Sequence, residues 1–195
     1  MSLIRLLGLY ASYWRYKIRC RRHVRFNGFT VVYAFPGSSI EFVPLRPGTD
    51  DEPTVINSHW TSNLLGLHQR SILVARHGGR IRIGRGCGIS GSTIYAMSEI
   101  VLGDDVRLGA NCKVMDNDFH ALDADLRRQG RPEDIPRRPI HIGAGCFIGT
   151  DCILLKGTTL GAGCVVGAGS VVTGTWPPGS VIAGNPARLI REQKI

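Results

Sequence analysis

The sequence is poor in aromatic residues, at 7% of 195, and has no apolar run long enough to span a membrane as a helix. Its six cysteines lack the paired spacing with histidine that zinc sites use, and the chain is not of the short, loop-rich type that disulfides stabilise. Residues 1–28 hold seven basic residues and no acidic one, out of a net charge of +9. No recognised nucleic-acid module accompanies that charge, so nucleic acid is not an expected partner. We expect one globular domain in a reducing cytoplasm.

Residues 1–22 are predicted to form a basic amphipathic helix. Apolar side chains fall on one side of it: Leu3, Leu6, Leu7, Tyr10, Tyr13, Trp14 and Ile18. Arginines fall opposite: Arg5, Arg15, Arg19 and Arg22. The charges follow the apolar part and no cleavage site stands out, which argues against a cleaved signal. Two roles stay open, namely packing on the protein itself or a neighbouring subunit, and peripheral contact with an anionic membrane or a lipid-linked substrate.

What the sequence does contain, from residue 81 onward, is a repeat with a period of six. Its later part is the series Ile142, Ile148, Leu154, Leu160, Val166 and Val172. Its earlier part is Ile83, Ile89 and Tyr95 and then, after one extra residue, Leu102, Leu108 and Val114. Neither a helix nor a single strand has this period, but a short strand followed by a tight turn does. Three such segments make one coil of a solenoid, with one aliphatic side chain pointing inward from each.

Five cysteines occupy the same position of the repeat, four residues after an aliphatic one. They are Cys87, Cys112, Cys146, Cys152 and Cys164. Because this position also holds Thr93, Val106, Thr158 and Ser170, we interpret it as a small, inward-facing site. Cys146 and Cys164 should stack on adjacent coils, so a bond between them is conceivable, but packing in the core is the favoured interpretation.

Three stretches carry a resemblance to a known family: GRIRIGRGCGISGSTIYA, VLGDDVRLGANCKVMDNDFH and the closing segment from IGAGCFIG to GNPARLIRE. They resemble the hexapeptide-repeat acyltransferases, and within these the sugar and polysaccharide O-acetyltransferases of the maltose and galactoside acetyltransferase type. The resemblance is strong over residues 81–192 and loose over 24–80. It implies an all-β, left-handed parallel β-helix, a homotrimer with active sites between neighbouring subunits, and acyl transfer from acetyl-CoA without a metal.

The expected organisation has four parts. The amino-terminal helix, residues 1–22, precedes irregular early coils over 23–80, with loops at 46–53 and 59–68. A regular β-helix follows over 81–183, interrupted by a loop at 121–139, and residues 184–195 form a tail. In the early loops, His59, Trp60 and Asn63 could line an acceptor cleft, although an ordinary surface loop is the simpler interpretation.

His120 stands out because counting by six from Leu102, Leu108 and Val114 lands on it. The repeat then stops for about twenty polar residues that include three prolines, so this insertion must loop out of the solenoid. An imidazole has an unperturbed pKa of about 6.5, which suits a general base at neutral pH. In the resembling family, the histidine of such a D-x-x-H or T-x-x-H stretch removes the proton of the acceptor hydroxyl. The structural alternative is that His120 caps the coil and bonds a backbone carbonyl.

Three further residues are candidates for the catalytic site. Asp116 and Asp118 could orient the imidazole or bind sugar hydroxyls, and they could equally be solvated loop acids. Acyl transfer also needs a donor to the developing oxyanion. Some family members use an asparagine of the preceding coil, where this chain has Ser90-Gly91-Ser92, so Ser90 or a backbone N–H is the candidate donor.

The resemblance also implies where coenzyme A lies. Carried over position by position, its contacts fall on Phe147, Thr150, Ala168, Thr173, Arg188 and Arg191. The two arginines suit the phosphates of the cofactor. A lysine common after the V-V-T run is replaced by Gly174, which removes one phosphate contact.

The expected function is transfer of an acetyl group to a sugar hydroxyl of a surface glycan, its lipid-linked precursor or a related saccharide. A non-enzymatic scaffold or binding protein is one alternative. A γ-carbonic-anhydrase-like zinc enzyme is another, but it would need three histidines at a subunit interface, and none follows closely after His120. We expect a cytoplasmic protein, with the inner face of the membrane as the alternative location.

Overall fold

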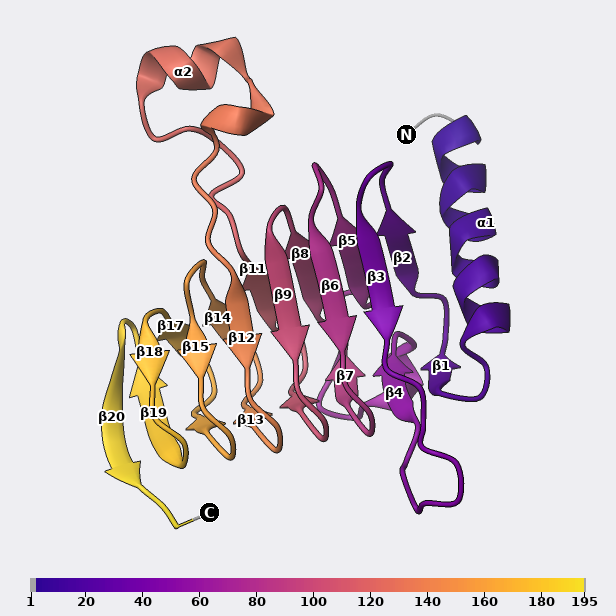
Figure 1. Ribbon diagram of the computed structural model, residues 1–195, viewed down its shortest axis with the longest axis vertical. Helices are drawn as coiled ribbons and strands as arrows, with labels where there is room; N and C mark the ends of the chain where they lie inside the picture. The colour runs from indigo at the N-terminus through magenta and orange to yellow at the C-terminus, as the bar shows by residue number, and fades with distance from the viewer. Residues whose placement is uncertain (1–2, 195) are drawn as a thin grey trace.

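The computed structural model describes residues 3–194, with side chains from residue 7 onward. Its strands form three sheets, here called A, B and C, which are the sides of a triangular prism (Figure 1). This is the left-handed parallel β-helix that the family resemblance implies. Sheet A contains, in order, β1 (Val24–Asn27), β4 (Thr54–Asn57), β7 (Gly88–Ser90), β10 (Arg107–Leu108), β13 (Phe147–Ile148), β16 (Val165–Val166), β19 (Ser180–Gly184) and β20 (Ala187–Glu192).

The other two sheets have six strands each. Sheet B consists of β2 (Val31–Ala34), β5 (Ile72–Ala75), β8 (Thr93–Ala96), β11 (Lys113–Met115), β14 (Ile153–Leu154) and β17 (Val171–Val172). Sheet C consists of β3 (Ser39–Phe42), β6 (Arg80–Ile83), β9 (Glu99–Leu102), β12 (Ile140–Ile142), β15 (Thr159–Leu160) and β18 (Thr175–Trp176). Because strands β1 to β19 follow one another in the order A, B, C, the chain turns a corner of the prism after each of them except β19.

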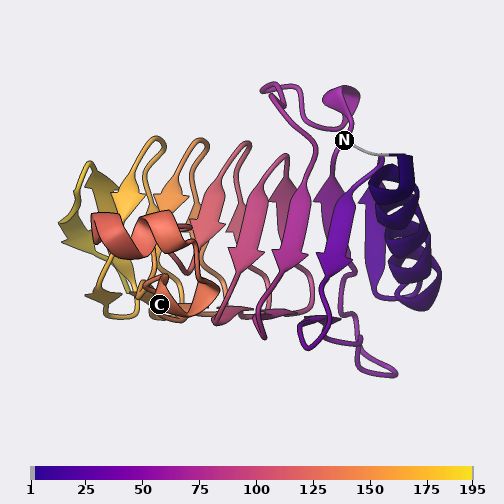
Figure 2. The ribbon, with the colours of Figure 1, turned by 90° about the horizontal axis from the view of Figure 1, so that it is seen from above.

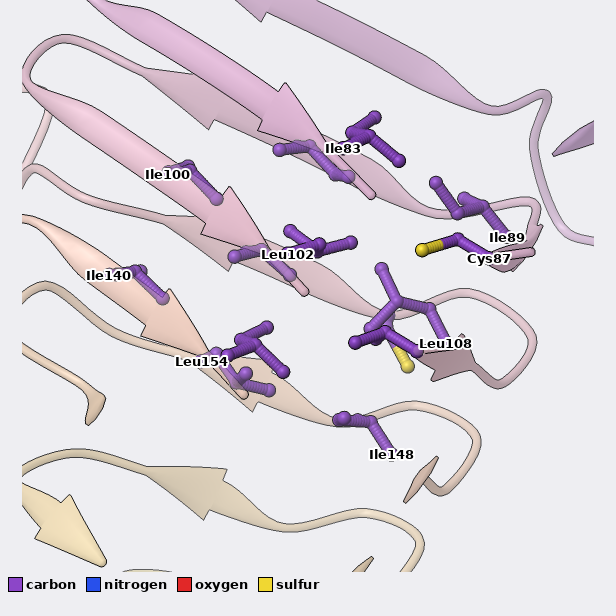
Figure 3. Packing of buried hydrophobic residues seen from close by; sticks show 14 of the residues in the cluster. Ile83, Cys87, Ile89, Ile100, Leu102, Leu108, Ile140, Ile148 and Leu154 are labelled. Atoms are coloured by element: carbon purple, nitrogen blue, oxygen red, sulfur yellow. The ribbon is translucent and has the colours of Figure 1, made fainter. Parts of the chain in front are cut away.

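The core is a column of mainly aliphatic side chains, one or two from most strands, with cysteines between them (Figure 3). The five cysteines of the repeat are fully buried and free, which confirms the prediction that they pack inside. Burial raises the pKa of Cys87 and of Cys146 to about 11, so these thiols stay protonated at neutral pH.

Glycines at the corners let successive coils stack closely. A Cβ on Gly149 would lie 2.6 Å from the backbone nitrogen of Ala168, one coil further along, which is closer than two atoms can pack. The glycines that follow the aliphatic residues in the hexads are therefore a requirement of coil spacing.

Residues 23–80 contain regular coils, contrary to the expectation of irregular ones. Strands β1 to β6 continue the three sheets, with β4, β5 and β6 in parallel register with β7, β8 and β9. The six-residue phase is lost in the sequence because two insertions leave the prism, at residues 43–53 between sheets C and A, and at 58–71 between A and B (Figure 2). The second contains a short 3-10 helix, η1 (Trp60–Ser62).

A third insertion, residues 116–139, leaves the corner between sheets B and C. It contains α2 (Ala124–Gln129) and the 3-10 helix η2 (Pro132–Asp134), and it projects well beyond the prism (Figure 1). Asp123 caps α2 by accepting hydrogen bonds from two backbone N–H groups, and Gly130 ends it in the left-handed conformation. The loop predicted at 121–139 thus begins several residues earlier.

Helix α1 (Leu3–Arg19) packs across the end of the first coil (Figure 1). Ser12 donates a hydrogen bond to the carbonyl of Val32 (2.5 Å), and the buried Tyr13 ring packs against Phe26 and Phe29. The predicted apolar side is mostly exposed, because the face that includes Ser12 and Tyr16 packs on the prism. Leu7, Trp14 and Ile18 are more than half exposed, and Tyr10 is partly covered by stacking on Phe29. The side chains of Leu3, Arg5 and Leu6 lie outside the described part. No helix within residues 3–194 combines the length and apolarity needed to cross a bilayer.

The carboxyl-terminal segment is also more ordered than the expected tail. Strand β20 pairs antiparallel with β19 and closes that edge of sheet A. The turn between them, around Gly184, reverses the chain, so the last strand cannot continue the parallel stack.

Candidate functional site

The insertion at the B–C corner is fixed at its root by Asp116. This side chain is fully buried and accepts hydrogen bonds from the backbone N–H groups of Met97 (2.8 Å) and Ser98 (2.7 Å), one coil earlier. It also accepts one from the Asn117 amide (3.0 Å). Both carboxylate oxygens are thereby used within the corner, so the structure places Asp116 in a supporting position and does not direct it at His120.

His120 is exposed, although the six-residue count assigns it an aliphatic position. The chain leaves the coil at Asn117, which bridges to Arg137 at the other end of the loop. The Asn117 side chain then accepts a hydrogen bond from the N–H of Phe119 (3.0 Å), whose backbone is left-handed at φ 61. This turn carries His120 outward before the sixth position is reached.

Tyr95 faces outward as well, which corrects its place in the repeat. The register pairs Ile94 with Val114, and Ile94 and Ala96 are the buried residues of β8. The corner before β8 is one residue short, so Tyr95 falls on the outer surface. Its ring packs on Phe119, with centroids 4.8 Å apart, and this contact holds the turn that precedes His120.

A cavity of about 390 Å³ lies between the insertion and the corner turns of the preceding coils. His120, Tyr95 and Phe119 line it, and the remaining lining residues are Arg76, His77, Met97, Ala121, Leu126, Arg127, Gly130, Arg131, Pro132 and Ile135. Burial and, next, the charges of Arg76 and Arg137 lower the pKa of His77. His120 therefore lines a cavity whose walls are strongly cationic and partly apolar.

Asp118 lies beside this turn but is paired with Lys156, at 2.5 Å from Nζ to Oδ1. Its backbone N–H also donates to the carbonyl of Pro136, and its Oδ2 is buried without a hydrogen-bond partner. The pair ties the insertion to the next coil. Asp118 is not among the residues that line the cavity with His120.

Ser90 and most of the expected coenzyme A contacts lie elsewhere on the prism. Ser90 is nearly buried at the end of β7, where its hydroxyl accepts a hydrogen bond from Asn57 (3.1 Å). Phe147 is half exposed on β13, and Thr150 and Ala168 follow at the A–B corner. The structure thus brings these residues together, but on a different corner from His120.

The last three expected contacts are also exposed. Arg188 and Arg191 stand on β20, and neither pairs with a carboxylate within the described residues. Thr173 alone lies at the B–C corner, after β17.

The loop residues His59, Trp60 and Asn63 lie on the insertion at the A–B corner, where Trp60 is 74% exposed.

Four residues that line the cavity are not predicted from the sequence: Arg76, His77, Arg127 and Arg131. Arg76 and His77 precede the regular repeat, in a corner whose phase is hidden by the early insertions. Counting back from the register of Ala75 with Ala96 would have placed them directly beside the root of the third insertion. Across residues 3–194, no group of three or more His, Cys, Asp or Glu side chains is arranged to hold a metal ion.

Comparison with known proteins places the chain among acetyltransferases. Residues 139–174 match the family model described as the hexapeptide repeat of succinyl-transferase. The chain is 35% identical to the galactoside O-acetyltransferase of Escherichia coli over 177 residues, 86% of this chain and 78% of that protein. It is 31% identical to a probable acetyltransferase of Mycobacterium tuberculosis over 68% of this chain, but spans only 41% of that relative.

Solved structures agree with the fold. A maltose O-acetyltransferase from Clostridium difficile aligns with a TM-score of 0.56 and 32% identity, over 63% of this chain and 64% of that one. A hexapeptide-repeat acetyltransferase from Vibrio cholerae, solved with acetyl coenzyme A, aligns over 100% of this chain and 92% of its own, with a TM-score of 0.62 and 20% identity.

Proposed function

Because the chain belongs to the hexapeptide-repeat acetyltransferases, we propose that it transfers an acetyl group from acetyl-CoA to a sugar hydroxyl. The acceptor would be a surface glycan, its lipid-linked precursor or a related saccharide. The observation that carries the proposal is the position of His120, exposed at a cavity large enough for a sugar ring, in a chain whose relatives are named galactoside and maltose O-acetyltransferases.

In this mechanism His120 accepts the proton of the acceptor hydroxyl. The hydroxyl oxygen forms the new ester bond at the thioester carbonyl carbon, and the carbon–sulfur bond breaks. The proton returns from the imidazole to the departing sulfur, so the products are the acetyl ester and the free thiol of coenzyme A. A backbone N–H or the Ser90 hydroxyl would donate to the oxyanion that forms on the carbonyl.

The residues present fit coenzyme A. Arg188 and Arg191 offer exposed guanidinium groups to its phosphates, while Phe147 offers half-exposed apolar surface on the same sheet. Acetyl-CoA supplies the activated thioester. Since these residues and His120 lie on different corners of one prism, we propose a homotrimer in which His120 of one subunit faces the A–B corner of the next.

Thiol release is the test of this function. Purified protein is incubated with acetyl-CoA and a panel of free sugars, nucleotide sugars and lipid-linked oligosaccharides. We expect free thiol to appear only with an acceptor, in equal amount to the acetylated product. If the protein neither releases thiol with any acceptor nor binds acetyl-CoA, the β-helix is a scaffold and the proposal is wrong.

We also propose that the outer face of α1 binds an anionic membrane surface. The exposed apolar side chains of α1 adjoin a cavity of about 400 Å³ lined by four cations: Lys17, Arg21, Arg22 and Arg25. Lys17 joins the two regions, because its Nζ lies 4.9 Å from the Trp14 ring centroid. None of the four has a carboxylate partner in the described part of the chain. Apolar and aromatic residues beside unpaired cations match the chemistry of an acidic bilayer.

Sedimentation with lipid vesicles tests this contact. We expect binding to vesicles containing phosphatidylglycerol and none to phosphatidylcholine alone. A basic side chain near such a surface contributes about 1 kcal/mol, so the double variant Arg21→Glu/Arg22→Glu should bind at least about tenfold more weakly. Trp14→Glu should also weaken binding, while Lys194→Glu, at the other end of the chain, should not. Equal binding to neutral vesicles, or loss of a protein oligomer in Trp14→Glu, would contradict the proposal.

A further inference from the structure

Resting on the proposed function, we infer that the acceptor is anionic: a saccharide that carries a carboxylate or a phosphate close to the hydroxyl that receives the acetyl group. The cavity at His120 is lined by Arg76, Arg127 and Arg131, and no Asp or Glu is among its lining residues. A neutral sugar would leave this concentration of positive charge uncompensated.

The three arginines differ in how much of their charge is available. Arg131 is partly neutralised, because its Nε lies 2.8 Å from a carboxylate oxygen of Asp134. Arg76 and Arg127 have no carboxylate within 4 Å in residues 7–194. The cavity therefore holds two guanidinium groups that the described part of the protein does not compensate.

Arg76 is the stronger of the two candidates. Its side chain makes no hydrogen bond within the described residues, and even its buried Nε has no acceptor. The guanidinium is nevertheless held in place, since it lies over the ring of Phe35 at 4.7 Å from the centroid. A cation that is fixed by stacking and left without an anion is arranged to bind one that arrives from outside.

Arg127 approaches the same cavity from the insertion. One of its terminal nitrogens donates to the carbonyls of Ala121 (3.0 Å) and Leu122 (2.9 Å), which fixes the side chain at the root of the loop. Arg76 belongs to the prism and Arg127 to α2, so an acidic group between them would be bound by both the prism and the insertion. The lowered pKa of His77 agrees with this arrangement, because Arg76 contributes to it.

Binding and kinetics together test the inference. Galactose, galacturonate and galactose 1-phosphate share one ring and differ in charge, so binding of each is measured by ligand-observed NMR, alongside KM values where acetyl transfer occurs. We expect the acids to bind at least tenfold more tightly than galactose, and the two acids separate carboxylate from phosphate recognition. Arg76→Gln should weaken acid binding about tenfold and leave galactose unchanged, with Arg76→Lys intermediate. Arg82→Gln, exposed on β6, is the matched control.

Three outcomes would overturn the inference. If galactose binds as tightly as galacturonate and galactose 1-phosphate, the cavity does not select an anionic sugar. If Arg76→Gln weakens the binding of galactose and of the two acids equally, Arg76 has only a structural role. If Arg76→Gln instead raises the KM or Kd of acetyl-CoA, the charge serves the donor. Acid binding that depends on Arg76 without any acetyl transfer would support the inference and count against the proposed reaction, so the two failures are distinguishable.

Discussion

Replacing His120 with alanine should lower kcat for acetyl transfer by about a thousandfold, because a positioned general base contributes 10² to 10⁴. The side chain is exposed and no hydrogen bond to it is present in the described residues, so its removal should leave the folded structure and its stability unchanged. The measurement is acceptor-dependent thiol release by wild type and variant at saturating acetyl-CoA. Circular dichroism and thermal unfolding of both proteins report whether the fold is intact.

A matched control and a mixing experiment sharpen this result. His141 is also exposed, on β12 and away from the cavity, so His141→Ala should retain full activity. If His120→Ala is as active as wild type, the histidine is a cap and the mechanism is wrong. Coexpression of His120→Ala with Arg188→Glu/Arg191→Glu should restore activity that neither parent has, since a shared site can take one intact half from each subunit. No recovery in mixed oligomers would place each site within one chain.

The Asp116→Ala variant should lose about 3 kcal/mol of stability, since it leaves the buried backbone N–H of Met97 and the partly buried one of Ser98 without an acceptor. In a domain of this size, such a loss corresponds to a fall in Tm of about 10 °C. Thermal and urea unfolding at one fixed protein concentration measure it, because the stability of an oligomer depends on concentration.

Two further variants test whether Asp116 supports the fold or is an ordinary solvated loop acid. Asp125→Ala removes a carboxylate that is 74% exposed on α2, and its effect should stay within about 0.5 kcal/mol. Asp116→Asn keeps one acceptor oxygen and should lie between alanine and wild type. The folded fraction of Asp116→Ala should retain most of its kcat, whereas a loss of kcat as large as that of His120→Ala would mean that Asp116 acts in the chemistry.

The hexads predict the solenoid well because an inward aliphatic residue every six positions is both the sequence signal and the structural requirement. Each position from Ile142 to Val172 faces the core, and the cysteines four residues later pack beside them. The insertion is equally visible, since a proline-rich polar stretch lacks the six-residue spacing of aliphatic residues that fills the core. Where the period continues, sequence and structure therefore agree.

Prediction of the site is weaker because it depends on where the chain departs from the period. Tyr95 is displaced to the surface by a corner one residue short, and His120 by a turn at Asn117 that the count does not anticipate. From the sequence, Asp116 could be a site residue or an ordinary loop acid, yet its partners are backbone groups of another coil. The cationic cavity joins Arg76 to Arg127 across the third insertion, a contact that no local pattern encodes.

The two ends of the prism differ from its middle, and this has a consequence for assembly. A parallel stack presents unpaired strand edges at both ends, and such edges can pair with those of another molecule without limit. Here α1 covers the first coil, and β20 meets β19 in the opposite direction. At the carboxyl end, the reversed strand β20 occupies the edge of sheet A, and at the amino end α1 lies across the first coil, so both features disfavour addition of an identical parallel coil.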